Sequence, residues 1–326
     1  MQGSPAHAAL AVEDRLEQHR VELTGFCYRM LGSVDAEDAV QETFIRAWRG
    51  LDGFEGRAAL RSWLYRIATN VCLDMLEGRK RRARPMDLGL AREPDAANLN
   101  ALPEVTWIEP MPDSRVVPEG DPAEVAVTRE TVRLAFVAAL QHLPPRQRAA
   151  LILCEVLRWK ASEVAELLDT SIASVASALQ RARATLEARN ATAASTAPSL
   201  GEADAELLAR YVDAFERYDI EALTSLIHED ATQSMPPYDL WLSGRDDILG
   251  WWVGPGAGCR SSRVIPAVAG NGSPAFGQYR PSASGRGHDP WALQALEISH
   301  GRIVGLTFFL DTDTLFSLFG LPARLD

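Results

Sequence analysis

The chain has 326 residues, enough for two or three domains, and its hydrophobic content of 47% suffices for their cores. Its net charge of −11 at pH 7 argues against a protein that binds DNA over its whole surface. The acid is unevenly placed, however. Residues 91–127 hold 2 basic and 8 acidic residues and residues 191–326 hold 9 and 17, whereas residues 128–190 hold 9 and 6. A local basic surface for phosphate is therefore still expected.

The chain opens without a basic and then apolar leader, and no apolar run approaches the length of a membrane span. The four cysteines show no paired spacing, and the first three stand among apolar residues of expected helices: Cys27, Cys72, Cys154 and Cys259. We therefore expect a cytoplasmic protein with reduced thiols, with no membrane association, no metal site and no cofactor.

Apolar residues recur at helical spacing from about residue 13 to residue 84, interrupted near residues 32–35 and 50–53. This pattern predicts a compact all-helical unit. A basic run closes it, with Arg79, Lys80, Arg81, Arg82 and Arg84. Such a run is usually a solvated helix end, and phosphate binding is the alternative.

Residues 91–127 carry six prolines and a surplus of acid, a composition that disfavours helix and cannot bury a core by itself. We expect an extended tether here. Trp107 and Ile108 are apolar anchors within it, so the short piece around them should dock on protein.

Helical periodicity returns from residue 121 to about residue 190. The apolar residues of the last two helices each fall on one face: Val164, Leu167 and Leu168, then Ile172, Val175 and Leu179. Ser162 and Ser171 are the expected N-caps. The turn comprises only Asp169 and Thr170, which is typical of a helix-turn-helix. An ordinary helical hairpin is the alternative, because the turn lacks the frequent glycine.

Residues 191–202 form a second linker by their small polar side chains, and residues 203–326 follow another pattern. Helices are expected at residues 206–218 and 222–227, followed by strands at about 231–234, 262–269, 275–279, 291–299 and 302–310. His300 and Gly301 join the last two strands in a tight hairpin. Helices followed by a curved antiparallel sheet make an α+β domain. Residues 308–310 and 315–322 are apolar strand edges, which serve either as core or as a docking surface.

Residues 38–48 and 54–70 resemble the second conserved region of extracytoplasmic-function (ECF) sigma factors, and residues 143–183 resemble their fourth region. The linker motif at Trp107 and the motif Met235-Pro-Pro-Tyr are similar to the subgroup with a fused SnoaL-like domain, the mycobacterial sigma G type. The resemblance implies a multidomain chain with two all-α sigma domains, the second a helix-turn-helix, and an α+β SnoaL-like (NTF2-like) cone. The expected boundaries are 13–90, 91–127, 128–190, 191–202 and 203–326.

The resemblance implies a transcription initiation factor that binds core RNA polymerase and opens promoter DNA, with no catalysis of its own. It implies polymerase contacts by Asp38, Gln41, Glu42 and Phe44. Capture of an opened strand requires cations beside aromatic and amide groups. The resemblance assigns that capture to Arg57, Arg61, Trp63, Arg66 and Asn70, with the basic run Arg79, Lys80, Arg81 and Arg82 behind them. Core packing explains Trp63 at least as well.

The last helix of the expected helix-turn-helix departs from the family pattern, which places arginines in the central turn. This chain has Val175-Ala-Ser-Ala there. Base reading would fall to Ser171, Ser174, Ser177 and Gln180, and phosphate contacts to Arg181 and Arg183. Because each arginine contact to guanine adds roughly 1–3 kcal/mol of discrimination, we expect weak reading of the minus-thirty-five element.

The tail raises an alternative of another class, a small-molecule sensor or an enzyme, since SnoaL relatives include cyclases and isomerases. The candidates for proton transfer are His228, Asp230, Asp239 and His288, although such residues are more often solvated. A mostly apolar pocket, better suited to binding a ligand, is expected from Gln233, Met235, Tyr238, Trp241, Trp252, Phe276, Gln278, Trp291 and Gln294. We rank regulation by contact of the acidic tail first, a ligand sensor second and an enzyme third.

Overall fold

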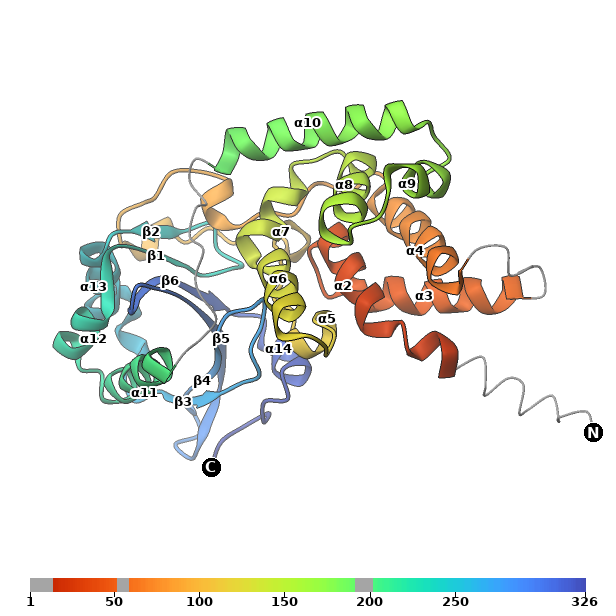
Figure 1. Ribbon diagram of the computed structural model, residues 1–326. Helices are drawn as coiled ribbons and strands as arrows, with labels where there is room; N and C mark the ends of the chain where they lie inside the picture. Colours follow the sequence, from red (N-terminus) through yellow and green to blue (C-terminus); the bar gives the residue numbers. More distant parts are fainter. Residues whose placement is uncertain (1–13, 52–58, 191–201) are drawn as a thin grey trace, which may run out of the picture. The chain divides into compact units, whose positions relative to one another are not determined.

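A computed structural model describes residues 14–51, 59–190 and 202–326. The chain divides into two compact units, whose elements can be followed by colour in Figure 1. The helical unit comprises Met1–Arg82 and Asp113–Ala193, and the sheet unit comprises Ala83–Pro112 and Ala194–Asp326. Arg57 and the linker residues 191–201 lie outside the described residues. In the described ranges no helix combines the length and the apolar character that crossing a bilayer requires.

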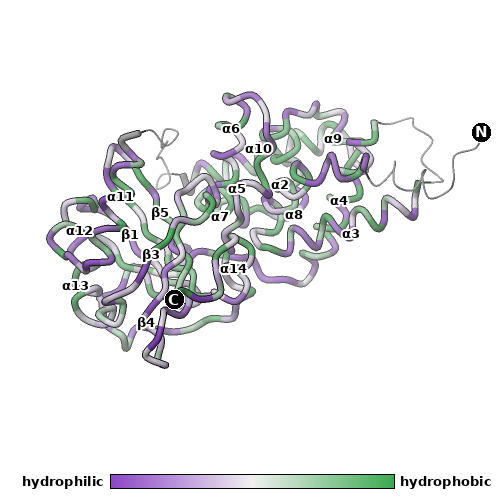
Figure 2. The backbone as a smooth tube through the Cα atoms, turned by 90° about the horizontal axis from the view of Figure 1, so that it is seen from below, coloured by the Kyte–Doolittle hydropathy of each residue, from purple (hydrophilic) through white to green (hydrophobic). Residues whose placement is uncertain are grey.

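The helical unit is built around α2 (Arg20–Leu31), in which every residue from Leu23 to Leu31 is buried. The amphipathic α3 (Asp35–Gly50) packs on α2, and Figure 2 shows hydrophobic and hydrophilic residues alternating along it. The other helices of this unit are α4 (Leu60–Leu76), α5 (Asp113–Val116), α6 (Pro122–Val132), α7 (Leu134–Gln141), α8 (Pro145–Leu151), α9 (Ala161–Leu167) and α10 (Ile172–Asn190). A π-helical turn, Ile152–Val156, continues α8.

Helices α9 and α10 form the expected helical pair. Ser171 caps α10, because its Oγ accepts from the Ser174 amide at 3.1 Å. Ser162 is not the cap of α9 as expected, since the helix begins at Ala161 and the Lys160 amide donates to Glu163 at 2.8 Å. Asp169 supplies the left-handed turn residue, with φ 52°, that glycine more often provides.

The apolar faces of this pair are mostly buried, with one correction. Val164 and Val175 are fully buried between the helices. Ile172, expected on the same buried face, is 56% exposed because it lies in the first turn of α10, beyond the reach of α9. The first turn of α10 is therefore presented to solvent.

The sheet unit contains a six-stranded sheet in the order β2-β1-β6-β5-β4-β3. Its strands are β1 (Ile227–Ser234), β2 (Trp241–Ser243), β3 (Arg263–Pro266), β4 (Ala275–Pro281), β5 (His288–Ser299) and β6 (Arg302–Phe309). The sheet is mixed rather than antiparallel, because β1 pairs with β6 in parallel. Neighbouring strands in sequence could be predicted as hairpins, whereas this distant pair could not. The tight hairpin is confirmed, since His300 and Gly301 both have positive φ.

Helices cover both sides of this sheet. In Figure 1, α11 (Glu202–Arg217) lies across the opening of the curved sheet, beside α12 (Ile220–Leu226) and α13 (Arg245–Val253). On the opposite side lies α14 (Thr312–Leu318), where Phe316 meets Tyr279 edge to face at 5.1 Å. Of the residues expected as apolar strand edges at 315–322, those up to Leu318 are instead helical, and the buried ones are Leu315, Phe316, Phe319 and Leu321. Their spacing fits a helix, and Leu315 and Phe319 are each 2% exposed.

Residues 83–112, which we name the strap, pack with the sheet unit and contain the short turns Pro85–Asp87, Ala96–Asn98 and Glu104–Thr106. Trp107 and Ile108 are buried, as expected of docking anchors. The residues expected as one tether, 91–127, divide in the structure. Those up to Pro112 belong to the sheet unit, and those from Asp113 onward belong to the helical unit.

Helix α5 approaches α2 so closely that a Cβ atom at Gly25 would stand 2.6 Å from the Val116 carbonyl oxygen. Alanine favours a helix by about 1 kcal/mol over glycine, but the contacted atom belongs to the backbone and cannot rotate away. We expect Gly25→Ala to destabilise the protein by about 1–3 kcal/mol in urea unfolding. Gly120→Ala, which meets no atom within 4 Å, is the control and should change stability little. A neutral Gly25→Ala would contradict this close packing.

Candidate functional site

A stripe on α3 faces solvent. Asp38, Gln41, Ile45 and Trp48 are all exposed, and their spacing of three, four and three residues puts them on one side of the helix. Ile45 is 36% exposed and Trp48 48% exposed. Large apolar side chains together on a surface mark an interaction site. We name these four residues the α3 stripe.

The other two residues expected on this surface are placed differently. Phe44 is 7% exposed and packs inward, with the Arg20 guanidinium 4.9 Å from the centre of its ring. Glu42 accepts from Arg46 at 2.7 Å within α3. Sequence reasoning missed Ile45 and Trp48. The signal was present, because both are apolar residues in register with Asp38 and Gln41.

Helix α4 carries Arg61 and Tyr65 four residues apart on one face, and Arg66 projects from an adjacent side of the helix. The Arg61 Nε donates to Glu22 at 2.8 Å, and its guanidinium lies 5.2 Å from the centre of the Tyr65 ring. Arg66 donates to the Glu166 carbonyl oxygen at 3.2 Å. Asn70 is exposed one turn further along. A cation and an aromatic ring therefore share one side of α4, and a second cation and an amide share another.

Trp63 is half-buried, and its ring packs close to Gly50. A Cβ atom added to Gly50 would lie 3.1 Å from that ring. This is a packing contact between α4 and the end of α3. Core packing, the alternative interpretation of Trp63, accounts for this contact.

A buried polar joint connects α2 with α7 and α8. Arg148 is 3% exposed and donates to the Met30 carbonyl, to the Gln141 side chain at 2.6 Å and to the Leu143 carbonyl at 3.1 Å. Arg29 is likewise buried and donates to Thr131 at 2.8 Å. Burial lowers the pKa of both guanidinium groups to about 10. These acceptors are neutral, so the two buried charges are costly to hold.

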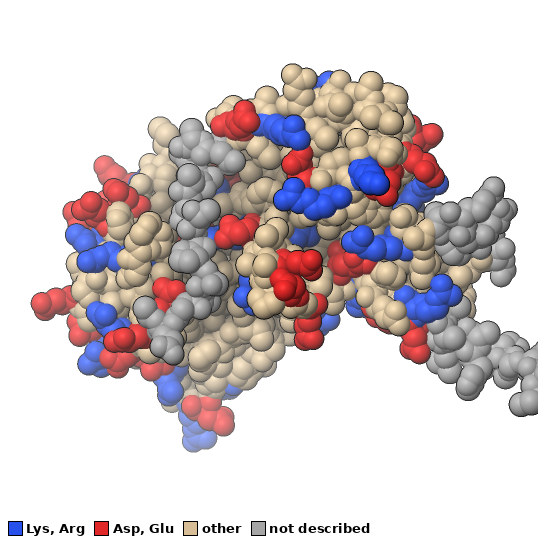
Figure 3. All heavy atoms as spheres, in the orientation of Figure 1, with Lys and Arg blue, Asp and Glu red and all other residues tan. Residues whose placement is uncertain are grey.

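The basic run is largely engaged inside the helical unit. Arg79 and Arg82 contact Asp35 at 2.9 and 3.2 Å, and Arg81 bonds to His142. Lys80 is exposed. On the face drawn in Figure 3, basic and acidic side chains of this unit are interspersed. The run therefore has a structural role at Asp35 in addition to any role with phosphate.

All six residues expected to read DNA are exposed: Ser171 just before α10, and Ser174, Ser177, Gln180, Arg181 and Arg183 on it. Ser171 serves as the helix cap described above. Arg183 forms an ion pair with Glu155, so its guanidinium already has an acidic partner. The exposed surface of α10 thus offers small hydroxyls and one amide where the family pattern has arginines.

The tail side chains expected to line a pocket hydrogen-bond one another. Tyr211 donates to Gln294 at 2.9 Å, Gln294 to Gln278 at 3.0 Å, and Gln278 to Ser262 at 3.1 Å. Trp252 donates to Gln233 at 2.8 Å. All of these side chains are buried, and burial raises the pKa of Tyr211 well above its usual value. Partners inside the core account for these polar groups without a ligand.

The remaining expected pocket residues surround this network. Phe276 is buried. Met235, Tyr238 and Trp291 are partly exposed and pack against the same core. The Arg280 guanidinium lies 3.2 Å from the centre of the Trp291 ring. Trp241 points elsewhere, since its Nε1 donates to the Gly89 carbonyl of the strap at 2.9 Å.

The four candidates for proton transfer do not gather. His228 and Asp230 stand together at the exposed start of β1, with 3.9 Å between Nδ1 and Oδ2. His288 Nε2 lies 3.2 Å from the Ser261 carbonyl. Asp239 is bound by the strap. Among the described residues, neither histidine contacts Asp239. His228 and Asp230 are close to each other, but their side chains are 41% and 88% exposed and stand apart from the buried core.

The strap is fastened to the sheet unit around Asp239. Arg92 donates to the Asp239 carboxylate at 2.9 Å and Asn100 donates to it at 3.3 Å. Backbone bonds flank this pair, from Arg92 to Trp241 at 3.1 Å and from Leu102 to Pro237 at 3.0 Å. Further along, the Met111 amide donates to Asn271 at 2.8 Å. The strap therefore adds backbone pairing and an ion pair to the tail.

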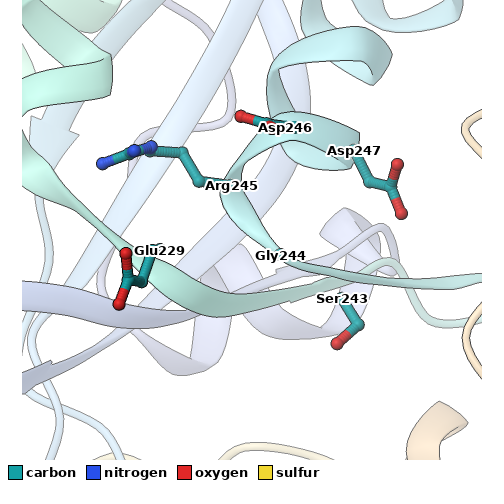
Figure 4. A pocket seen from close by; sticks show the side chains of 6 residues that line it. All are labelled: Glu229, Ser243, Gly244, Arg245, Asp246 and Asp247. Atoms are coloured by element: carbon teal, nitrogen blue, oxygen red, sulfur yellow. The ribbon is translucent and has the colours of Figure 1, made fainter.

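An open pocket of about 350 Å³ lies elsewhere on the sheet unit, at the start of α13. Figure 4 shows Glu229 on β1 and Arg245 extending to the same side, whereas Asp247 points away. The lining residues are Glu229, Ser243, Gly244, Arg245, Asp246 and Asp247. None of the nine expected pocket residues lines it. It is a polar surface hollow rather than the expected apolar site.

Asp35 is the acid that holds the basic run. Burial raises its pKa, but the hydrogen bond from Arg79 and the charges of Arg82 and Arg79 outweigh burial, so the pKa lies below its usual 3.8. The ionised group therefore stabilises the fold at neutral pH, and this contribution disappears as the pH falls through the lowered folded-state pKa.

We expect Asp35→Asn to cost about 0.5–1 kcal/mol at pH 7 and progressively less below about pH 4. Urea unfolding at several pH values measures this difference. Asp38→Asn, an exposed carboxylate on the same helix, is the matched control. An equal loss for both variants, or a loss that does not depend on pH, would rule out the ion pair as its source.

Comparison with known proteins identifies the parts of the chain. Family models match for Sigma-70 region 2 at residues 16–82, Sigma-70 region 4 at residues 133–186 and a SnoaL-like domain at residues 208–306. The ECF RNA polymerase sigma factor SigG of Mycobacterium tuberculosis is 47% identical over 314 residues, covering 95% of this chain and 83% of the relative. SigE of Mycolicibacterium smegmatis is 32% identical over 174 residues, covering 52% of this chain and 58% of the relative.

The fold has a known counterpart as well. The crystal structure of the extracytoplasmic function sigma factor SigJ of Mycobacterium tuberculosis matches with a TM-score of 0.59 at 23% identity, covering 96% of this chain and 99% of that one. The resemblance inferred from the motifs is confirmed, and the relatives are sigma factors rather than enzymes. This chain belongs to the ECF RNA polymerase sigma factors and carries a SnoaL-like domain after its fourth region.

Proposed function

We propose that the chain binds core RNA polymerase through the α3 stripe. The observation that carries this proposal is the exposure of Ile45 and Trp48 beside Asp38 and Gln41. Interfaces concentrate their binding energy in a few aromatic side chains, which polar residues surround. An exposed tryptophan on a polar helix of the second region suits that arrangement.

The opened promoter strand is captured on α4, with Arg61, Arg66 and Asn70 as its contacts. Guanidinium groups pair with phosphates, and the amide of Asn70 can hydrogen-bond a base edge. Helix α10 reads the minus-thirty-five element through Ser174, Ser177 and Gln180, with Arg181 toward phosphate. Because these side chains make few bidentate contacts, most of the affinity comes from the polymerase and from α4.

Trp48→Ala and Asn70→Ala should separate the two roles. We expect Trp48→Ala to weaken binding of core polymerase by about tenfold or more, since truncating an interface tryptophan typically costs 2 kcal/mol or more. Asn70→Ala should leave that binding intact and reduce promoter opening. Polymerase affinity by fluorescence anisotropy and opening by permanganate footprinting measure the two steps. The assignments are wrong if the two variants have the same effect on both steps.

The SnoaL-like tail acts on the sigma regions through the strap rather than by catalysis. The strap is the covalent connection between the second region and α5, and its Arg92 and Asn100 are held by Asp239 of the tail. Fastening a connecting segment limits how far the regions it joins can separate. The tail therefore restrains the spacing of the two DNA-binding regions. The buried glutamine network, which is satisfied internally, favours this role over binding a ligand.

Asp239→Ala should release the strap. We expect faster hydrogen exchange at the strap amides of Arg92 and Leu102, and a rise in transcription with core polymerase of about 2- to 10-fold. Asp230→Ala removes an exposed carboxylate from the same unit and is the matched control. If Asp239→Ala frees the strap without changing transcription, the tail does not act through it. His228→Ala and His288→Ala should leave transcription unchanged.

A further inference from the structure

Within the helical unit, the fourth region contacts part of the α4 surface to which we assign strand capture, while Arg61, Arg66 and Asn70 remain exposed. Trp159 lies just before α9, and its ring meets the Tyr65 ring at 5.1 Å with an interplanar angle of 60°. The Arg61 guanidinium is 5.8 Å from the centre of the same Trp159 ring. Tyr65 is 0% exposed. The indole of Trp159 thus packs against both the ring and the cation.

A second contact lies one turn along α4. Arg66 donates to the Glu166 carbonyl at 3.2 Å, and its Nη2 is 3.5 Å from the Glu166 carboxylate. Both side chains are largely exposed, at 46% and 78%. A carboxylate therefore stands beside one arginine of α4, while an aromatic ring stands beside another.

Single-stranded DNA presents the same two chemical groups to a protein. Its bases are flat rings that stack on aromatic side chains and guanidinium planes, and its phosphates are anions that pair with arginine. Trp159 offers a flat ring at Arg61 and Tyr65, and Glu166 offers an anion at Arg66. The fourth region thus occupies this face with groups of the kind that an unstacked strand would bring.

We propose that Trp159 and Glu166 act as an internal mimic of a single strand, so that the fourth region blocks strand capture until the helical unit opens. The inference rests on the proposed role of α4. The mimic competes with DNA for Arg61 and Arg66. Its removal takes the carboxylate from Arg66 and the indole from Arg61, which keeps its ion pair with Glu22.

The contacts are suited to being displaced. The ion pair at Arg66 is exposed, and the ring contacts at Arg61 are partly exposed, so each contributes little. The joint beneath them buries Arg29 and Arg148 against neutral acceptors, which makes the closed arrangement costly. A strand that brings several stacked bases and phosphates can outweigh two such contacts.

The test measures binding of a fluorescein-labelled pool of random-sequence single-stranded DNA 20-mers to the full chain by anisotropy. We expect Glu166→Gln combined with Trp159→Ala to raise the affinity by about 5- to 30-fold. Glu187→Gln on the exposed side of α10 makes the same charge change away from α4 and should not raise it. Ser162→Ala, on α9, is the control for an alteration of that helix.

A second measurement covers the case in which Trp159→Ala unfolds the unit. In the chain labelled with 5-fluorotryptophan, the ¹⁹F resonance that disappears in Trp159→Phe belongs to Trp159. Adding the same DNA pool to the otherwise unaltered labelled chain should shift this resonance as the indole leaves α4.

The outcomes separate this inference from the function on which it rests. If Arg61→Ala weakens binding of the DNA but Glu166→Gln matches Glu187→Gln and the Trp159 resonance does not shift, the mimic is wrong and the role of α4 stands. If Arg61→Ala and Asn70→Ala change nothing even in the Trp159→Ala, Glu166→Gln background, the capture role of α4 fails and the inference fails with it.

Discussion

Arg148 holds together the two halves of the helical unit from a fully buried position. It donates to the Met30 carbonyl at the end of α2 in the second region and to Gln141 and Leu143 in the fourth region. A guanidinium can satisfy carbonyls from separate helix ends because its donors form a rigid, planar fork. The carbonyl ends of two helices also carry partial negative charge, which suits a cation. Burial still disfavours the charge, so the joint specifies one geometry at a cost in stability.

The position of α9 follows from this joint. Helix α8 carries Arg148, and the π-helical turn leads from α8 toward Trp159 and α9. Once α8 is fixed against α2, Trp159 and Glu166 reach α4 and engage Arg61 and Arg66. The α3 stripe is on another face and stays exposed. The helical unit thus leaves the proposed polymerase contact open, while its fourth region contacts part of the surface proposed for the strand.

In the role that we propose, the sheet unit supplies a restraint on the strap rather than a reaction centre. Its interior polar groups are bonded to one another along Tyr211, Gln294 and Gln278. A network that is satisfied internally specifies the packing of the core and leaves few groups to orient a substrate. Asp239 lies outside this network and fastens the strap by accepting a hydrogen bond from Arg92. Such a domain can serve as a clasp without catalysis, because function depends on the site and not on the fold.

The sequence by itself determined the order of the domains, the helical pair α9 and α10, the strands β3 to β6 and the hairpin at His300, because these depend on local periodicity and turn chemistry. It also identified Trp107 and Ile108 as buried anchors, since two large apolar residues in a polar segment need a partner. Only the tertiary structure decided the parallel pairing of β1 with β6, the fastening of the strap at Asp239 and the placement of Trp159 and Glu166 on α4. Each of these joins residues about 70 to 150 positions apart. Periodicity indicates which face of an element is buried but not which distant element covers it, and that choice is made by the packing of the whole unit.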